Sequence, residues 1–202
     1  MKINREKQQF FNSHALNWDD EDHLSKIDRL GNIFKKYQIQ PSGNILDVGC
    51  GTGILVSPLI SSSVIPYQLF QLDFSREMIV ENKKKHTGAV KQNSFINGDA
   101  LHLPFPPETI QWLIGFAVLP HLGDTVGAIR EWTRVISSGG KILLLHFMSS
   151  RELNHCHSQI GGAVKSDHLL PVDDLANLFE KNGWRILQKK EMKDLYLLLA
   201  QK

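Results

Sequence analysis

The stretch NILDVGCGTGIL at residues 44–55 constrains the fold more than any other part of the sequence. A short apolar run leads into three glycines at alternate positions, Gly49, Gly51 and Gly53. Glycine lets a backbone turn tightly and approach a ligand closely, so the pattern predicts a strand, a ligand-binding loop and a helix in succession. The alternative is a tight strand-to-helix turn with no ligand.

Apolar, strand-like runs alternate with helix-like stretches along the rest of the chain. The expected strands cover residues 44–48, 67–73, 94–99, 110–118, 141–147, 184–191 and 194–202. Strands that alternate with helices of about a dozen residues indicate a parallel sheet covered on both faces. The last two runs are joined by a short polar turn and predict an antiparallel hairpin. The expected fold is therefore α/β: a doubly wound, seven-stranded, mostly parallel sheet with an antiparallel C-terminal strand.

The composition favours one compact domain over residues 1–202, because 42% of the residues are hydrophobic and 22% are charged. Apolar residues at helical spacing between positions 24 and 34 predict a helical cap or lid within residues 1–40. Residues 148–170 lack a clear period and predict a loop, or a short helix inside a loop, on the acceptor side of the site. Long loops in compact domains are often functional.

The net charge and the cysteine content indicate which binding partners and which cellular compartment to expect. The formal net charge of +2 is too close to zero to indicate a nucleic-acid or membrane partner. The two cysteines show no pairing pattern, so a reducing cytoplasm is expected. No apolar run approaches the roughly 20 residues of a membrane helix, and the first residues lack the apolar centre of a signal peptide. The sequence leaves the oligomeric state open.

Three aspartates lie in or directly after expected strands. Asp73 ends the second strand about 20 residues beyond the glycine loop, where a carboxylate can accept both ribose hydroxyl protons. Asp99 ends the third strand, where it can accept from an adenine amino group. Asp47 is a charge in an apolar strand and must meet loop amides or a cationic ligand, because an unpaired buried carboxylate is costly. The alternatives are a helix-capping role for Asp73 and an Asx turn at Asp99.

Together these motifs resemble a class I S-adenosylmethionine-dependent methyltransferase. The matching segments are LDVGCGTG at 46–53, QLDFSREMI at 71–79, NGDALHLPF at 97–105, and the run from FAVLPHL to KILLLHF. The resemblance covers residues 44 to 202. The chain is similar to the broad type 11 small-molecule group that includes the ubiquinone and menaquinone methyltransferases. The resemblance implies S-adenosyl-L-methionine as cofactor and S-adenosyl-L-homocysteine as product.

The resemblance also implies roles for individual cofactor-binding residues. The three glycines would line the methionine end of the cofactor, and Asp47 would lie near its amino group or the loop. Asp73 would hold the ribose. The remaining residues implied at the cofactor are Phe74 and Met78 beside the adenine, Asp99 and Ala100 at its edge, Phe116 beside the sulfonium, and His121 lining the site.

A dinucleotide dehydrogenase is the nearest rival for the glycine loop. Its fingerprint is G-x-G-x-x-G/A, whereas here the third glycine comes one residue earlier. The expected closing hairpin also fits the methyltransferase sheet better. The dehydrogenase is therefore the weaker alternative.

The acceptor-side candidates fall in two segments. In the first, Phe11 and Trp18 are expected to contact substrate, or else to pack on the sheet. In the second, Arg151 and Asn154 are expected to bind substrate, with a surface role as the alternative for Arg151. His157 and His146 are candidate catalytic bases, because imidazole titrates near neutrality; otherwise they are ordinary loop histidines. Metal-ligand spacings are absent, so no metal site is expected.

The motifs predict an enzyme that transfers a methyl group to a small-molecule acceptor. No [ND]-P-P-[YF] sequence, Pro-Cys pair or basic aromatic-rich extension points to a nucleic acid. Two alternatives stay open. One is a non-catalytic S-adenosylmethionine-binding protein with a regulatory or assembly role, and the other is a methyltransferase acting on RNA or protein.

Overall fold

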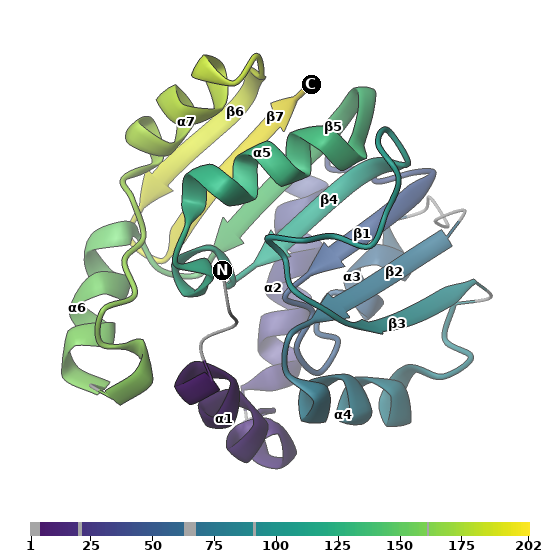
Figure 1. Cartoon of the computed structure of the whole chain (residues 1–202), viewed down its shortest axis with the longest axis vertical. Helices are drawn as coiled ribbons and strands as arrows, with labels where there is room; N and C mark the ends of the chain where they lie inside the picture. Colours follow the sequence, from purple (N-terminus) through teal and green to yellow (C-terminus); the bar gives the residue numbers. More distant parts are fainter. Residues whose placement is uncertain (1–4, 20–21, 63–67, 91, 161) are drawn as a thin grey trace. The chain divides into compact units, whose positions relative to one another are not determined.

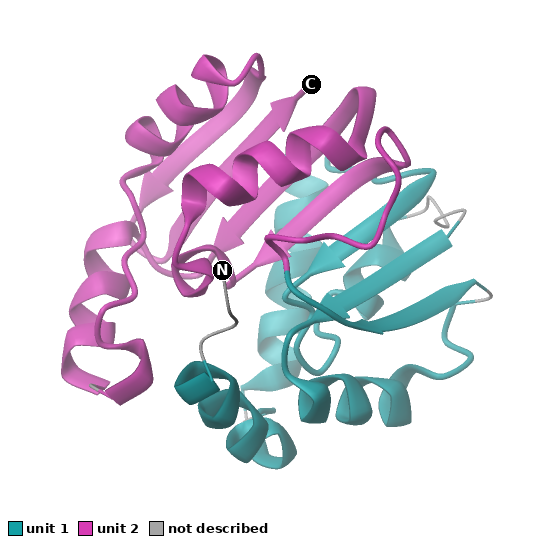
Figure 2. Ribbon diagram, in the orientation of Figure 1, with its two compact units in different colours: residues 1–99 teal, residues 100–202 magenta. Residues whose placement is uncertain are grey.

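The computed structural model describes residues 5–19, 22–62, 68–90, 92–160 and 162–202. The chain divides into two compact units, residues 1–99 and 100–202, which we call the amino unit and the carboxy unit (Figure 2). Each is described by itself below. The expectation of one domain over residues 1–202 stays a prediction.

The amino unit contains three parallel strands: β1 (Asn44–Val48), β2 (Gln68–Asp73) and β3 (Asn93–Asn97). β2 pairs with β1 on one side and with β3 on the other. Four of the five residues of β1 are buried, as expected for a parallel strand covered on both faces. All three strands agree with the sequence expectation, although Tyr67, the expected start of the second strand, lies outside the described residues.

The helices of the amino unit are α1 (Arg5–His14), α2 (His23–Lys36), α3 (Val56–Ser61) and α4 (Arg76–His86), with the 3₁₀ turn η1 at Ala15–Asn17. Helices α2 and α3 pack against each other, behind the strands in the view of Figure 1. The region expected as a helical cap thus contains two helices separated by a turn; its residues 1–4 and 20–21 are not described.

Helix α4 begins at a capping serine, Ser75. The hydroxyl oxygen of Ser75 accepts a hydrogen bond of 3.2 Å from the backbone N–H of Met78, which satisfies one of the unpaired amides of the first turn. Lysines at positions 83–85 occupy the last turn, where positive charge complements the helix dipole. This cap fixes the direction of the chain immediately after Asp73.

The carboxy unit contains β4 (Ile110–Phe116), β5 (Ile136–His146), β6 (Arg185–Met192) and β7 (Leu195–Gln201). Strands β4 and β5 are parallel, and β7 pairs antiparallel with both β5 and β6. The expected closing hairpin is confirmed. The other elements of this unit are η2 (Leu119–Leu122), α5 (Thr125–Val135), α6 (Ser150–Ile160), η3 (Gly162–Val164) and α7 (Val172–Lys181).

The strand order is β3-β2-β1-β4-β5-β7-β6, which confirms the predicted seven-stranded, mostly parallel sheet with an antiparallel C-terminal strand. Within the described segments, no helix combines the length and the apolar character needed to cross a membrane.

Two local expectations need correction. The fifth strand was expected to begin at residue 141, but β5 begins at Ile136 and includes the sequence SSGG at 137–140. Gly139 has φ 77°, and the register with β4 shifts between the pairs Ile110–Ile136 and Trp112–Lys141. The glycine therefore allows a bulge inside a continuous strand. In the 148–170 region, the short helix expected inside a loop is the eleven-residue α6.

Candidate cofactor and acceptor sites

The glycine loop follows β1 directly, and all three of its glycines have a positive φ. The φ values of Gly49, Gly51 and Gly53 are 68°, 51° and 95°, which other residues rarely adopt. A Cβ on Gly53 would lie 2.4 Å from Oδ1 of Asn82 and 2.5 Å from the ring of His86. The loop thus passes close to α4, and a side chain at Gly53 would push the two apart.

Asp73 connects this loop to the start of α4. Its Oδ2 accepts a 2.9 Å hydrogen bond from the N–H of Gly51, and its Oδ1 accepts one of 2.8 Å from the N–H of Ser75. A carboxylate has about four acceptor sites, more than these two bonds use. The position at the C-terminal end of β2 fits a ribose-binding role, which stays a prediction.

Asp47 is the most unusual group of the site. It lies in β1, is 1% exposed, and neither carboxyl oxygen has a hydrogen-bond partner among the described residues. Buried polar groups are normally hydrogen-bonded. Burial, with the charge of Asp73 as a second cause, raises the pKa of the Asp47 carboxyl well above its ordinary value. Two neighbouring carboxylates, one of them unpaired, fit a cationic ligand.

An aromatic cluster lies beside Asp73. Phe11, Ala15 and Met78 form a buried core against which Phe10 and Phe74 pack. The rings of Phe11 and Phe74 are 5.5 Å apart. Phe74 and Met78 were expected at the adenine and Phe11 at the substrate, and the structure brings the three together. Phe11 and Met78 are buried in this cluster and Phe74 is half-buried, and their expected contacts with adenine and substrate stay predictions.

Polar contacts from α1 reach the same turn. The side-chain amide of Gln8 donates to the carbonyl of Phe74 over 2.7 Å, and the Oδ1 of Asn12 accepts from the hydroxyl of Ser75 over 2.7 Å. These contacts join α1 to the segment immediately after Asp73. These contacts could not be predicted from the sequence, because a glutamine and an asparagine in a polar helix carry no distinguishing pattern.

The segment after α1 contacts the glycine loop itself. The ring of Trp18 lies 5.5 Å from that of Phe11, and its Nε1 would be 3.8 Å from a Cβ on Gly51. Asp19 accepts a 2.5 Å hydrogen bond from the hydroxyl of Thr52 and pairs with Lys85. Trp18, expected at the substrate, thus lies against the loop. Asp19 was missed, because the acidic run around it resembles an ordinary solvated segment.

Asp99 and Ala100 follow β3. The backbone just before them is held at Asp73, whose carbonyl accepts from the N–H of Gly98 and from the side chain of Asn97, each over 3.0 Å. Ala100, the first residue of the carboxy unit, is buried, and its carbonyl accepts from the indole N–H of Trp132 over 3.1 Å. Their expected contacts with adenine stay predictions.

In the carboxy unit, Phe116 ends β4 and its ring lies 4.8 Å from that of Phe147. The next residue, Ala117, has φ 56° and donates its N–H to the carbonyl of Leu145. A positive φ at a residue other than glycine is uncommon, and such strain gathers at functional sites. The chain therefore turns sharply at the point where the sequence predicts the cofactor sulfonium.

Three histidines and an aspartate gather in the carboxy unit. His121 of η2 contacts the carboxylate of Asp167 through Nδ1 at 2.5 Å, and its ring lies 5.3 Å from that of His157. His157 contacts the carbonyl of Asp167 through Nδ1 at 3.2 Å. His146, at the end of β5, is influenced by the charges of both other histidines. We call these four residues the histidine cluster.

The members of the histidine cluster differ in accessibility. The side chain of His121 is 18% exposed, whereas His157 and His146 are buried. Burial, followed by the charges of His121 and His157, lowers the pKa of His146 to about 3. His146 is therefore neutral at physiological pH. The predicted catalytic roles of His157 and His146 are not tested by this geometry.

Asn154 and Arg151 both belong to α6. The side-chain amide of Asn154 pairs with the backbone of Leu169 in both directions, over 2.8 and 3.0 Å. It thus holds the segment that carries Asp167. Arg151 is exposed in the first turn of α6. The predicted contacts of both residues with substrate remain predictions.

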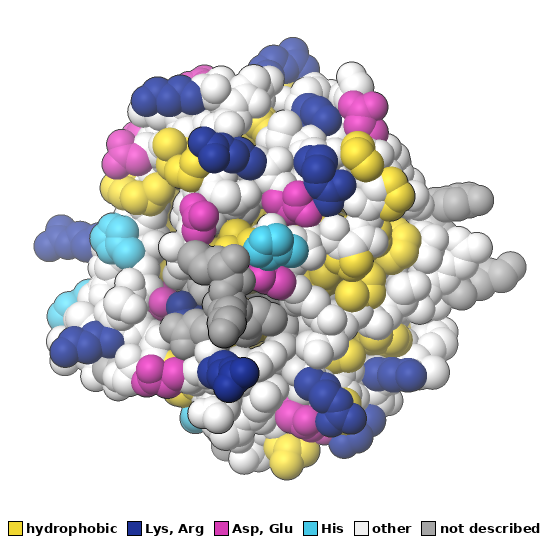
Figure 3. Space-filling model, viewed as in Figure 1, with side chains coloured by type: hydrophobic (Ala, Val, Ile, Leu, Met, Phe, Trp, Pro, Cys, Tyr) yellow, Lys and Arg dark blue, Asp and Glu magenta, His cyan; other side chains and the backbone are white. Residues whose placement is uncertain are grey.

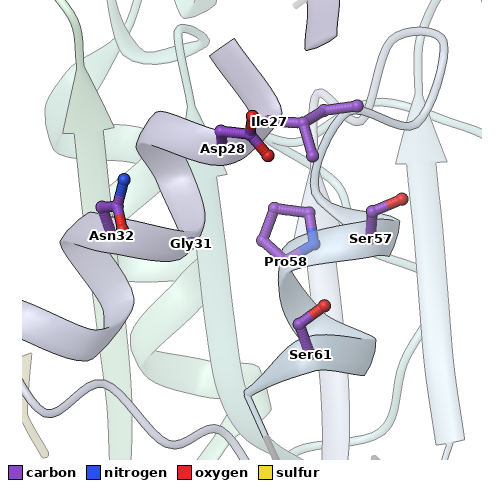
Figure 4. Close-up of a pocket in the computed structure, with 7 residues that line it drawn as sticks. All are labelled: Ile27, Asp28, Gly31, Asn32, Ser57, Pro58 and Ser61. Carbon is purple, nitrogen blue, oxygen red and sulfur yellow. The ribbon is translucent and has the colours of Figure 1, made fainter. Parts of the chain in front are cut away.

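A separate pocket lies between α2 and α3, as Figure 4 shows. Its lining consists of Ile27, Asp28, Gly31, Asn32, Ser57, Pro58 and Ser61. None of the residues predicted to bind cofactor or substrate belongs to it. Within the described ranges, no three His, Cys, Asp or Glu residues are grouped closely enough to hold a metal ion.

The loop, Asp73 and the unpaired Asp47 fit S-adenosylmethionine. That cofactor carries a positive sulfonium and ammonium together with a ribose and an adenine. We call Asp47, the glycine loop, Asp73 and the neighbouring Phe74 the donor cradle. It offers two carboxylates, loop amides and an apolar side chain at the C-terminal ends of parallel strands, where ligands of doubly wound sheets bind. Fold and site together define the class of S-adenosylmethionine-dependent methyltransferases.

Comparisons with known proteins agree. Residues 46–144 match the family described as "Methyltransferase domain". A demethylmenaquinone methyltransferase of Bacillus cereus (strain AH187) is 33% identical over 176 residues, covering 75% of this chain and 74% of that protein. One from Bacillus mycoides is 33% identical over 109 residues, and there the match spans less than half of the relative, 46%.

Solved structures show the same fold. A SAM-dependent methyltransferase from Aquifex aeolicus matches with a TM-score of 0.74 at 16% identity, covering 94% of this chain and 97% of that one. The PH0226 protein from Pyrococcus horikoshii matches with a TM-score of 0.72 at 19% identity, covering 91% and 92%. The chain belongs to the class I S-adenosylmethionine-dependent methyltransferases, in the methyltransferase-domain family.

Proposed function

We propose that this protein transfers the methyl group of S-adenosylmethionine to a small-molecule acceptor. The single observation that carries the proposal is the buried carboxylate of Asp47, two residues before the glycine loop, which has no hydrogen-bond partner among the described residues. Such a group is costly in a folded protein unless a ligand of opposite charge or a hydrogen-bond donor reaches it. The sulfonium–ammonium cofactor of the family meets that requirement.

The protein contributes little covalent chemistry to methyl transfer. The reaction is an in-line displacement at carbon, and the sulfonium already activates the methyl group, so the protein must position both reactants and exclude water. Asp73 and the glycine loop hold and orient the donor in this proposal. The apolar cluster around Phe74 and Met78 excludes water from its adenine.

A quinol is the first acceptor to test, because the named relatives are demethylmenaquinone methyltransferases. The charge distribution supports a small acceptor over RNA. The net charge is only +2, and lysines and arginines are scattered among acidic side chains on the face shown in Figure 3. A nucleic-acid site requires a concentrated basic surface.

Calorimetry with S-adenosylhomocysteine tests the cofactor site. The wild-type protein should bind it, and Asp73→Ala should weaken binding about 10- to 100-fold, because a charged hydrogen bond contributes about 1.5–3 kcal/mol. Asp28→Ala, an exposed carboxylate on α2, is the matched control and should bind as wild type does. If the wild-type protein does not bind S-adenosylhomocysteine even at a high concentration of this ligand, the proposal is wrong.

Incubation with methyl-labelled cofactor tests turnover. A reduced demethylnaphthoquinone and a fractionated metabolite extract serve as acceptor sources, and mass analysis identifies the labelled product. Label in a small molecule supports the proposal. Cofactor binding without any labelled product favours a non-catalytic, S-adenosylmethionine-binding protein. Label in RNA or protein favours a methyltransferase that acts on one of those macromolecules.

A further inference from the structure

Three amide side chains connect the glycine loop to the sheet of the amino unit. Gln71 of β2 donates from Nε2 to Oδ1 of Asn93 on β3 over 2.8 Å. Asn82 of α4 donates from Nδ2 to Oε1 of Gln71 over 2.8 Å and to Sγ of Cys50 over 3.4 Å. Because Cys50 belongs to the loop, a continuous chain of hydrogen bonds runs from β3 through β2 and α4 to the loop.

The two central amides of this chain lie in the core. Gln71 and Asn82 are both 0% exposed. A strand of a parallel sheet covered on both faces usually carries apolar side chains, as Leu69 and Leu72 of β2 do. Replacement of two hydrogen-bonded partners by apolar side chains of the same shape can be nearly neutral for stability. Stability alone therefore does not require amides here, whereas a buried hydrogen-bond network fixes the position of the groups that it joins.

Asn82 meets the loop at a second point through its oxygen. Oδ1 is buried, has no hydrogen-bond partner among the described residues, and would lie 2.4 Å from a Cβ on Gly53. The ring of His86, one turn further along α4, would lie 2.5 Å from the same Cβ. One face of α4 thus limits how closely the loop can approach, and glycine at position 53 leaves the room that Asn82 needs.

The two contacts of Asn82 lie on either side of Gly51 in the chain. Gly51 donates its N–H to Oδ2 of Asp73 over 2.9 Å. The N–H of Gly53 donates to the carbonyl of Cys50 over 2.9 Å, which joins the two contact points to each other. A displacement of Asn82 would therefore move the loop relative to Asp73, within the donor cradle.

We propose that Asn82 is a positioning residue that holds the glycine loop in the shape to which S-adenosylmethionine binds. The inference rests on the proposed function, because that function places the cofactor at this loop. Asn82 is fully buried, so it acts through Cys50 and Gly53 and not by touching the cofactor. Gln71 orients the Asn82 amide.

Calorimetry with S-adenosylhomocysteine tests the proposal in variants that keep the approximate shape of each side chain. Asn82→Leu should weaken binding about 3- to 10-fold, the effect of losing one hydrogen bond. Gln71→Met retains the bond between Asn82 and Cys50 and should weaken binding less. In the variant with both changes, the loss should equal that of Asn82→Leu alone, because Gln71 acts only through Asn82.

A matched control is available on α2. Asn32→Leu makes the same change at an exposed asparagine of the amino unit and should bind S-adenosylhomocysteine as the wild-type protein does. Denaturant unfolding of each variant shows that it is folded under the conditions of the titration.

Hydrogen exchange separates the proposed role from a general contribution to stability. In Asn82→Leu, exchange at the amide of Gly53 should accelerate by a larger factor than exchange at the amide of Leu69. The first amide lies in the loop, whereas the second is bonded to the carbonyl of Gln92 beside the sheet. Equal acceleration at both amides indicates a merely structural role and overturns the proposal.

The inference and the proposed function fail on different results. Wild-type affinity in both Asn82→Leu and Gln71→Met overturns the inference and leaves the cofactor site standing. If Asn82→Leu does not fold, wild-type affinity in Gln71→Met has the same meaning. If the wild-type protein does not bind S-adenosylhomocysteine, the proposed function fails, and exchange at Gly53 and Leu69 still decides whether Asn82 holds the loop.

Discussion

Asp47 shows how a single residue can be unfavourable for the folded protein and favourable for its ligand. Its carboxyl lies in a strand, buried and without a hydrogen-bond partner in the described part of the chain. Burial first, and the charge of Asp73 second, raise its pKa. The ligand-free protein therefore holds a proton here above the pH at which an exposed aspartate loses it.

The sign of the resulting pH dependence is set by that raised pKa. The unfolded chain ionises at the ordinary aspartate pKa, whereas the folded protein does so at a higher pH. Stability from this group is present at low pH and is lost as the pH rises through that window. Asp47→Asn should flatten the decline in melting temperature over the window, as thermal melts in a pH series will show. An unchanged slope would contradict the assignment.

Cofactor binding should release the proton of Asp47. A cationic ligand favours the ionised carboxylate, so binding displaces the proton into the buffer. Calorimetric titration with S-adenosylmethionine in two buffers of different ionisation enthalpy measures the number released. The wild-type protein should release up to one proton from this site, and Asp47→Asn should release fewer and bind more weakly. Equal release by both proteins would exclude Asp47 as the source.

At the scale of elements, α1 and the segment after it are joined to the donor cradle. Phe11 packs on Phe74 and Met78, Asn12 contacts Ser75, and Asp19 contacts Thr52. These contacts join the helical cap to both the glycine loop and the start of α4. The cap and the cradle should therefore respond together to a change in either.

Phe11→Ala should destabilise the protein by about 3 kcal/mol, because removal of a buried aromatic ring leaves a cavity. It should also weaken S-adenosylhomocysteine binding, since the ring supports the wall formed by Phe74. Denaturant unfolding and calorimetry measure the two effects. Leu16→Ala is the control, because Leu16 is 78% exposed and should change neither quantity by much.

Asn154→Ala should loosen the segment that carries Asp167. Its amide makes two hydrogen bonds with the backbone of Leu169, and loss of each costs about 0.5–1.5 kcal/mol. Hydrogen exchange at the amide of Leu169 should become faster in the variant. Exchange as slow as in the wild-type protein would show that other contacts hold the segment.

At the scale of the whole molecule, ligand binding should stabilise the fold by mass action. S-adenosylhomocysteine at about 100 times its dissociation constant should add about 2.7 kcal/mol to the free energy of unfolding. The melting temperature should rise with ligand concentration. NADH at the same concentrations is the control, because a dinucleotide site would respond to it instead.

The sequence was sufficient for the fold and for the position of the glycine loop in it. Alternating strands and helices, the glycine loop and the closing hairpin are local patterns, in which neighbouring residues dictate the backbone conformation. The bulged residues 137–140 were misassigned because serine and glycine also occur in connectors. The pairing that draws them into β5 is with a distant strand.

Only the tertiary structure decided which polar side chains meet. The pairing of His121 with Asp167, of Asp19 with Thr52 and of Asn12 with Ser75 joins residues 33 to 63 positions apart. Such contacts leave no period or spacing in a single sequence, because they depend on how packed elements bring their side chains together. The sequence by itself determined the backbone cradle, and the packing of elements onto it decided which side chains surround it.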